Sequence, residues 1–147
     1  PERRELEAQV QRLGLAERVV FAGEQDHAYV VEALYASDLF VFPSQTETLG
    51  LAVLEAMAAG RAVVAVRGGA IPEIVRDGET GRLVPPDPAA LRRAIADLLE
   101  TPALRRGMGE RGKAWAASRS QARVVEQLVG VYHEVIAAHN APTHAPA

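Results

Sequence analysis

The sequence predicts an α/β fold, a Rossmann-like open parallel sheet with helices on both faces. Short runs rich in β-branched and aromatic residues alternate along the chain with segments of helical periodicity, which is typical of parallel βαβ units. Two of these runs, LFVFPS and RAVVAV, are continuously apolar, as expected of strands that are covered on both faces. Right-handed crossovers between parallel strands then place helices on both faces of the sheet.

Each element up to Gly60 follows from its local pattern. Apolar residues at helical spacing predict helices, and β-rich runs that end at Gly or Pro predict strands. The expected elements are a helix over 2–14, a strand over 18–23, a helix over 26–38, a strand over 39–44 and a helix over 51–59. The residues expected to face inward in the helix over 26–38 are Val30, Val31, Leu34 and Tyr35.

The elements after Gly60 continue the alternation and then become helical. They are a strand over 61–66, a short helix over 72–78, a strand over 80–84, and helices over 88–100, 102–118 and 121–139. Pro72 is expected at the first position of the short helix, and Asp87 is expected to cap the helix that Pro88 begins. The tail over 140–147 is expected to be disordered, which leaves one domain over 1–139.

The composition excludes several classes of function. The net charge of −3 argues against an electrostatic grip on nucleic acid, and no apolar run reaches the length of a membrane span. The chain has no cysteine, so disulfides, thiolate nucleophiles and cysteine-based zinc sites are excluded. The absence of cysteine and of a recognisable signal fits a cytoplasmic protein. The four histidines, at 27, 133, 139 and 144, lack the spacing of a metal cluster.

Ligands of open parallel sheets bind beyond the carboxyl ends of the strands. The loops that follow the predicted strands are 23–27, 44–50, 67–71 and 84–87. Glu47 and the pair Gly68 and Gly69 fall in two of these loops. Glu55 lies eight residues after Glu47, among Leu, Val, Ala and Met, where a carboxylate needs a partner to offset its desolvation.

The start of the helix near Gly50 is a second feature of this edge. Free N–H groups and the helix dipole there form a ready anion site. A ligand with hydroxyls at both ends and phosphates in the middle would satisfy both glutamates and these N–H groups. The alternative is that Glu55 caps or pairs with an Arg elsewhere in the fold.

Two other patterns resemble functional motifs but are not expected to form a site. Gly107, Gly109 and Gly112 form a GxGxxG pattern, but it follows no strand and lies inside a helical stretch, unlike a dinucleotide fingerprint. His133 and His139 lie on the terminal helix, where a structural role is expected. His27 follows a strand-end loop and is either a site residue or a polar residue at the start of a helix.

Residues 34–99, with E-x7-E, EAMAAG and GG…PEIV.DG.TG.LV, resemble the C-terminal half of a family 4 retaining glycosyltransferase of the GT-B fold. The resemblance implies that Glu47, the catalytic candidate, contacts hydroxyls of the donor sugar and that Glu55 accepts hydrogen bonds from the ribose. Backbone N–H groups would face the diphosphate and the sugar. The other implied positions, beside the diphosphate, the nucleobase and the donor, are Thr48, Leu49, Gly50, Leu51, Gly23, Glu24, Gln25, His27, Gly68 and Gly69.

The sequence departs from the family pattern in three ways. Leu49 stands where the family often has Phe, and GGAIPE has one residue more than the common G-G-x-P-E. The Arg and Lys that neutralise the diphosphate in the family are missing, since the only lysine, Lys113, lies in another element. Arg67 has no family role and is expected at the surface. The resemblance also implies that residues 1–139 are a partial nucleotide-sugar-binding domain and that an N-terminal acceptor domain lies outside this chain.

The resemblance implies that the parent transfers a hexosyl group from a UDP-, GDP- or ADP-sugar, with retention and without a metal or other cofactor. Its acceptor would be bound by the absent domain, and peripheral membrane association of the parent is compatible with the sequence. The isolated chain is expected to be inactive. The alternative is a stand-alone or degenerate sugar-nucleotide-binding module, which the coding sequence upstream of Pro1 would distinguish. A response-regulator domain would need clustered aspartates, whereas Asp38 and Asp87 are isolated.

Overall fold

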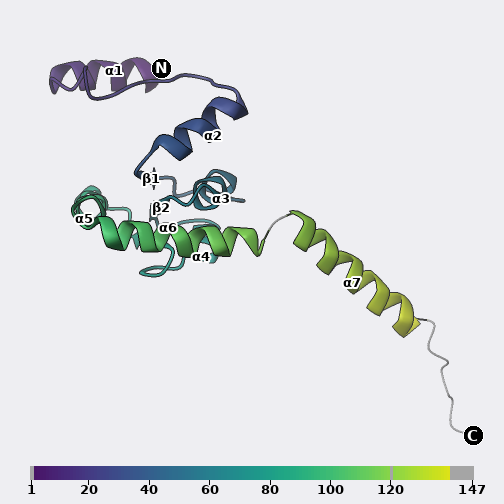
Figure 1. Ribbon diagram of the computed structural model, residues 1–147. Coiled ribbons are helices and arrows are strands. Elements are labelled where there is room, and N and C mark those ends of the chain that lie inside the picture. The colour runs from purple at the N-terminus through teal and green to yellow at the C-terminus, as the bar shows by residue number, and fades with distance from the viewer. Residues whose placement is uncertain (1, 120, 140–147) are drawn as a thin grey trace, which may run out of the picture. The chain divides into compact units, whose positions relative to one another are not determined.

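The computed structural model describes residues 2–119 and 121–139. The chain divides into two compact units, residues 1–30 and 31–147. The first unit contains α1 (Glu2–Arg12) and the beginning of α2 (His27–Ala36), which runs across the boundary into the second unit (Figure 1). The expected disorder of 140–147 lies outside the described residues.

The second unit is built on a parallel sheet in the order β1 (Leu39–Phe42), β2 (Ala62–Val66) and β3 (Gly81–Val84). Leu39 pairs with Ala62 and Val63 with Gly81, so neighbouring strands are parallel and in simple register. The helices that follow the strands are α3 (Leu51–Ala58), α4 (Ile71–Ile74), α5 (Pro88–Glu100), α6 (Pro102–Ala117) and α7 (Gln121–His139).

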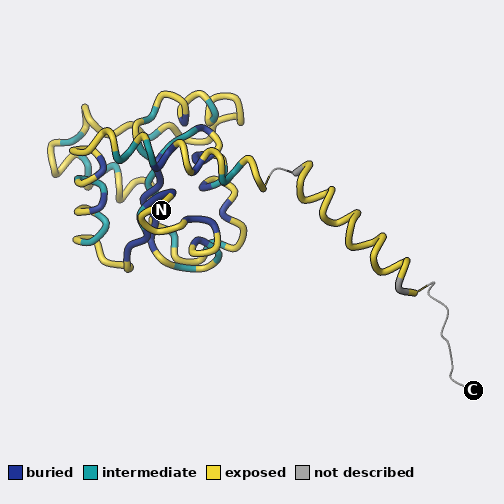
Figure 2. Tube along the Cα trace, turned by 60° about the horizontal axis from the view of Figure 1, so that its bottom comes forward, coloured by how far each residue is buried: buried dark blue, intermediate teal, exposed yellow. Residues whose placement is uncertain are grey.

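Helices cover both faces of the sheet, which confirms the predicted fold class. Successive residues of a strand point to opposite faces. Val63 and Ala65 therefore pack with α3 and α4, whereas Val64 and Val66 pack with α5. All five residues of β2 are buried, as its apolar run predicts. The buried residues line the interior of this unit as dark segments in Figure 2.

Helix α6 passes the amino ends of the strands from one face of the sheet to the other. Leu104 and Met108 belong to the core on the α5 side, whereas Trp115 packs against the core on the α3 side. Gly109 makes this passage possible, since a Cβ built there would lie 2.1 Å from the carbonyl oxygen of Gly60. Gly60 follows Ala59, the C-cap residue of α3, and has a φ of 74° in the left-handed region that glycine favours.

Two strand predictions need correction. Residues 18–23 form no strand, because a strand needs a ladder partner and none of the three described strands pairs with this segment. The run over 39–44 is a strand only to Phe42, and all its residues are half-buried rather than buried. Its position explains the difference, since β1 is an edge of the described three-stranded sheet.

Some helix predictions were also wrong in detail. Of the four residues expected to face inward in α2, only Leu34 is buried, while Val30 is 37% and Tyr35 58% exposed. Leu34 reaches the core beside α3, and Tyr35 instead borders a cavity at the amino ends of the strands. The helix expected over 72–78 covers only Ile71–Ile74, with Pro72 at its second position after Ala70.

The cap of α5 matches the prediction. The Asp87 carboxylate accepts hydrogen bonds from the N–H groups of Ala89 and Ala90 at 3.1 and 3.0 Å, with Pro88 in the first turn. Such caps satisfy donors that have no partner inside the helix. The cap fixes the start of α5 directly after the loop that leaves β3.

Candidate functional site at the carboxyl edge of the sheet

Three loops meet at the carboxyl edge of the sheet. β1, β2 and β3 end at Phe42, Val66 and Val84, so the loops 44–50, 67–71 and 84–87 share that edge, as predicted. The N–H of Arg67 donates to the carbonyl of Val84 at 2.7 Å and ties two of these loops together. The side chain of Arg67 is exposed, as expected.

Glu47 is the centre of the first loop. One oxygen of its carboxylate, Oε1, accepts hydrogen bonds from the N–H groups of Thr48, Leu49 and Gly50 at 3.0, 2.9 and 2.9 Å. Three consecutive backbone donors therefore point at a single position. The loop brings these N–H groups together, and the partner that they have in this structure is the protein's own carboxylate.

These hydrogen bonds also set the charge state of Glu47. Donation from Gly50 and Leu49 holds the pKa of the Glu47 carboxyl below its ordinary value, against an opposing effect of desolvation, and Thr48 adds the least to the lowering. Hydrogen bonds to the charged form favour that form. The position in front of α3 is therefore built to hold negative charge.

Gly50 stands at the start of α3, where the backbone conformation disfavours any other residue. It is the N-cap residue, with a φ of 63° in the left-handed region, and its carbonyl accepts from Val53 and Leu54 at 3.0 Å. A residue with a side chain would be strained there. The left-handed turn aims the N–H of Gly50 back toward Glu47 while the helix starts in another direction.

The second loop packs directly on the first through its two glycines. A Cβ on Gly68 would lie 2.5 Å from the carbonyl oxygen of Gln45, and one on Gly69 would lie 1.9 Å from that of Glu47. The N–H of Ala70 donates to the same Glu47 carbonyl at 2.9 Å. The close contact that holds the Glu47 backbone in place therefore requires glycine at both positions, and this explanation involves no ligand.

The additional residue in GGAIPE is accommodated at the start of α4. Ala70 is the N-cap residue of this helix, and Ile71 is fully buried in the core beside α3. The longer loop therefore places an apolar side chain in the core, while the two glycines keep their contact with 45–47.

Glu55 lies one turn inside α3, as the E-x7-E spacing predicts. Its side chain is exposed, so the expected burial among apolar neighbours is wrong. The neighbours in sequence explain this, because Val53, Ala56 and Met57 take the core-facing side of the helix and leave Glu55 on the outer side. There Glu55 lines an open groove of about 380 Å³ between α3 and α6.

The segment predicted to lie beside a nucleobase belongs to the compact unit 1–30, whereas 47–69 belongs to the other unit. Gly23 has a φ of 71°, and the side-chain amide of Gln25 donates to the carbonyl of Ala22 at 2.6 Å. The two residues flank a bend at position 24, before α2. His27 is the first residue of α2.

The glycine pattern lies inside a helix and follows no described strand, as predicted. Gly107, Gly109 and Gly112 lie inside α6, and the last two are buried in its contacts with the rest of the fold. His133 and His139 are exposed on α7.

Two features are absent from residues 2–119 and 121–139. Within them, no three His, Cys, Asp or Glu side chains come together as ligands for a metal ion. No helix in these ranges has both the length and the apolar character needed to cross a membrane.

Comparison with known proteins identifies the family. The family model described as glycosyl transferases group 1 matches residues 1–115. The chain is 37% identical over 130 residues to the N-acetyl-alpha-D-glucosaminyl L-malate synthase of Bacillus anthracis, a match that covers 86% of this chain and 33% of that protein. It is 39% identical over 138 residues to the D-inositol 3-phosphate glycosyltransferase of Acidothermus cellulolyticus, covering 93% and 30%.

Solved structures agree with this relationship. The sucrose-phosphate synthase of Thermosynechococcus elongatus is similar with a TM-score of 0.83 and 37% identity, over 93% of this chain and 35% of that one. The Anabaena protein HepE in complex with UDP is similar with a TM-score of 0.80 and 29% identity, over 90% and 36%. The chain thus spans about a third of the length of its relatives. It belongs to the glycosyl transferases group 1 family, with the parallel α/β architecture of GT-B glycosyltransferases.

Proposed function

We propose that this chain is the donor-binding part of a retaining family 4 glycosyltransferase, which transfers a hexosyl group from a nucleotide-activated sugar to an acceptor. One observation carries the proposal. At the carboxyl edge of the sheet, three N–H groups in front of α3 converge on one anionic oxygen, that of Glu47. Glu55 follows on the same helix. Parallel α/β sheets bind their ligands at this edge.

The N–H groups of 48–50 are suited to a phosphate oxygen of the donor. Free N–H groups at a helix start, together with the helix dipole, favour anions. In the donor complex, a diphosphate oxygen takes the place of Glu47 Oε1, and the carboxylate turns toward the hydroxyls of the donor sugar. The short hydrogen bonds to Glu47 support this view, because they show that the three donors can share one anionic acceptor.

Glu55 is the proposed acceptor for the ribose hydroxyls. Its side chain is exposed on the outer side of α3, on the helix that begins directly after the Glu47 loop. Gly23 and Gln25 belong to the turn proposed to lie beside the nucleobase, and Gly68 and Gly69 to the turn beside the donor. Leu51 completes the row of N–H groups at the helix start. HepE, which is similar to this chain, has been solved with UDP and with UDP-glucose, which supports a nucleoside diphosphate sugar as donor.

Transfer with retention is proposed to proceed at the front face of the donor, where the leaving diphosphate helps to deprotonate the acceptor. Stabilisation of charge on the leaving group is the main requirement of such a step. The N–H groups of 48–50 meet part of it, and cations from other parts of the parent protein meet the rest. No metal or other cofactor takes part in this proposal, the parent is cytoplasmic, and the isolated chain is inactive in transfer.

The test is a titration of the chain with UDP, GDP and ADP and with their sugars, followed by amide NMR. We expect shifts at 23–27 and 47–55 with one preferred base, and a loss of binding of about tenfold or more in Glu55→Ala, because charge-assisted hydrogen bonds to two hydroxyls disappear. Glu100→Ala, an exposed glutamate at the end of α5, is the matched control. Shifts confined to other regions, or an equal loss in both variants, would refute the assignment.

A further inference from the structure

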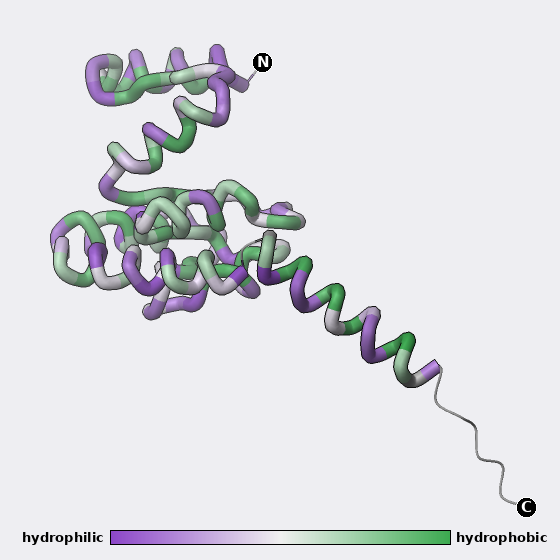
Figure 3. Tube along the Cα trace, turned by 45° about the vertical axis from the view of Figure 1, so that its right-hand side comes forward, coloured by the Kyte–Doolittle hydropathy of each residue, from purple (hydrophilic) through white to green (hydrophobic). Residues whose placement is uncertain are grey.

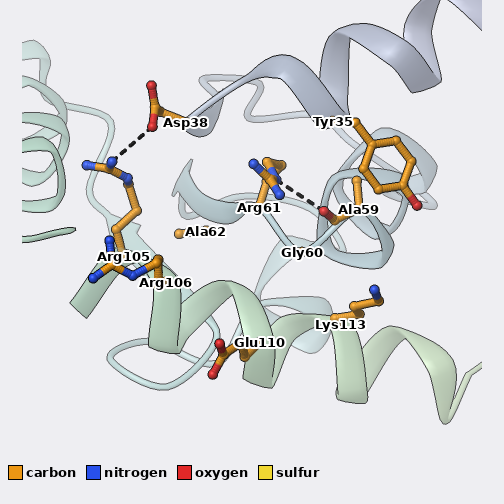
Figure 4. A pocket seen from close by; sticks show the side chains of 10 residues that line it. All are labelled: Tyr35, Asp38, Ala59, Gly60, Arg61, Ala62, Arg105, Arg106, Glu110 and Lys113. Atoms are coloured by element: carbon orange, nitrogen blue, oxygen red, sulfur yellow. Dashed lines mark hydrogen bonds and ion pairs between the residues drawn. The ribbon is translucent and has the colours of Figure 1, made fainter. Parts of the chain in front are cut away.

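A cavity lies at the amino ends of β1 and β2, whereas Glu47 lies at the carboxyl ends of the strands. Asp38 directly precedes β1, and Arg61 directly precedes β2. The cavity has a volume of about 470 Å³, which is within the usual range of small-molecule sites. Its charged lining consists of Arg61, Arg105, Arg106, Lys113, Asp38 and Glu110. Figure 4 shows these side chains around the same space.

The lining carries more positive than negative charge. Four cations face two carboxylates, and one carboxylate is already engaged, since Asp38 accepts from Arg105 at 2.9 Å. Arg61 donates to the carbonyls of Ser37 and Ala59 at 2.6 and 3.1 Å. Carbonyl oxygens hold this guanidinium in position but do not neutralise its charge.

Two further cations have no partner within the described part of the chain. Neither Arg106 nor Lys113 makes a hydrogen bond or an ion pair with another described residue. Both come from α6, two turns apart, on the side that borders the cavity. Glu110 lies between them in sequence, and no ion pair connects it to either one. These two side chains can therefore turn to an anion at no cost in existing contacts.

The floor of the cavity is rigid. The side chain of Arg105 is only 15% exposed, and its guanidinium donates to the carbonyls of Leu98 and Leu99 at 3.0 and 3.1 Å as well as to Asp38. Gly109 packs on the Gly60 carbonyl, which presses α6 against the turn that carries Arg61. Fixed donors need less ordering when a ligand binds, so more of the interaction appears as affinity.

We propose that this cavity binds a small organic phosphate. Its phosphate would be held by Arg61, Arg106 and Lys113, because guanidinium and ammonium groups are the side chains that bind phosphate best. The volume exceeds that of inorganic phosphate, and the carboxylate of Glu110 with the exposed Tyr35 offers acceptors for hydroxyl groups on the remainder of the molecule. This site is separate from the carboxyl edge and does not depend on the proposed donor.

The test is amide NMR of the whole chain titrated with glycerol 3-phosphate, with inorganic phosphate as the smaller probe. We expect shifts at 59–62 and 105–113, and tighter binding of glycerol 3-phosphate than of inorganic phosphate. The double variant R106Q/K113Q should bind about tenfold more weakly or worse, since two charge-assisted hydrogen bonds are lost. R92Q/R93Q removes the same charge from exposed positions of α5 and should bind as the unchanged chain does.

Three results would overturn the proposal. The first is the absence of shifts at the cavity with millimolar probe. The second is equal weakening in both double variants, which would indicate general charge attraction. The third is equal binding of the two probes, which would indicate a site for free phosphate only. A separate UDP titration tests the donor proposal independently of the phosphate proposal. UDP shifts at 47–51 should be unchanged in R106Q whether or not the cavity binds phosphate. Arg106 is replaced alone in this comparison because Lys113 also lines the groove beside Glu55.

Discussion

Glu47 holds its loop through both its side chain and its backbone. Its carboxylate is the acceptor for three neighbouring N–H groups, and its own backbone carbonyl accepts from Ala70. Gly69 permits the second contact, because any side chain at this position would collide with the Glu47 carbonyl. The loop is therefore held from both sides, by the side chain in front and by the Gly-Gly turn behind.

The charge of Glu47 predicts a pH dependence of this loop. Because the pKa of the carboxyl is lowered in the folded chain, its contribution to stability is present above the unfolded pKa and is lost as the pH falls through the lower folded value. The amide NMR signals of Thr48, Leu49 and Gly50 should accordingly titrate together, with a midpoint below the ordinary pKa of a glutamate.

The control for this titration is Glu47→Gln, which keeps the size of the side chain and removes its charge. The common low-pH transition of the three amides should be absent in this variant. A midpoint at or above the ordinary glutamate pKa in the unchanged chain would contradict the hydrogen-bond geometry, as would independent midpoints for the three signals.

At the scale of elements, α6 depends on glycine for its place across the sheet edge. Glycine normally destabilises a helix interior by about 1 kcal/mol relative to alanine. Gly107→Ala should therefore stabilise the chain by about 0.5–1 kcal/mol, since the added Cβ would meet only the flexible end of Arg111 at 3.3 Å. Gly109→Ala should destabilise it by about 1–3 kcal/mol, because the Cβ would collide with the Gly60 carbonyl.

Urea unfolding of the two variants measures this difference, and its sign is the decisive result. Both substitutions add one methyl group to the same helix two positions apart, so helix propensity changes equally in the two. If Gly109→Ala were as stable as Gly107→Ala, α6 would not pack on the Gly60 turn. The cavity described above would then lack its fixed wall.

The same element explains what sequence reasoning could and could not predict. β2, the cap at Asp87 and the start of α3 at Gly50 were predictable, because each depends on a local pattern. The arrangement of Glu47 in front of α3 followed from the E-x7-E spacing and the fold class. The failed strand at 18–23 and the half-buried β1 depend on ladder neighbours, which a local apolar run does not specify.

The cavity at the amino ends of the strands could not be predicted for a related reason. Arg61 and Arg105 are 44 positions apart, and only the passage of α6 beside the Gly60 turn brings them to one space. The signal that pointed there was the glycine pattern at 107–112, which reads as a nucleotide fingerprint in isolation. In this fold the glycines instead allow α6 to pack closely against its neighbours.

At the scale of the whole molecule, the described side chains of α7 contribute nothing to the core. Its apolar residues alternate with polar ones along the helix, as Figure 3 shows, and all its described side chains are exposed. Val124, Leu128, Tyr132 and Val135, for example, are 51–61% exposed. Burial of apolar area is the main stabilising term in folding. The stability of the sheet and its helices should therefore be independent of α7.

A chain that ends at Arg119 tests this expectation. Its free energy of urea unfolding should lie within about 0.5 kcal/mol of that of the full chain, as for changes at exposed positions, while circular dichroism reports the lost helix. Leu98→Ala, at a fully buried position of α5, is the positive control and should lose about 2–5 kcal/mol. A loss on truncation that approaches the loss in Leu98→Ala would mean that α7 buries apolar surface against this chain in solution, contrary to its exposure here.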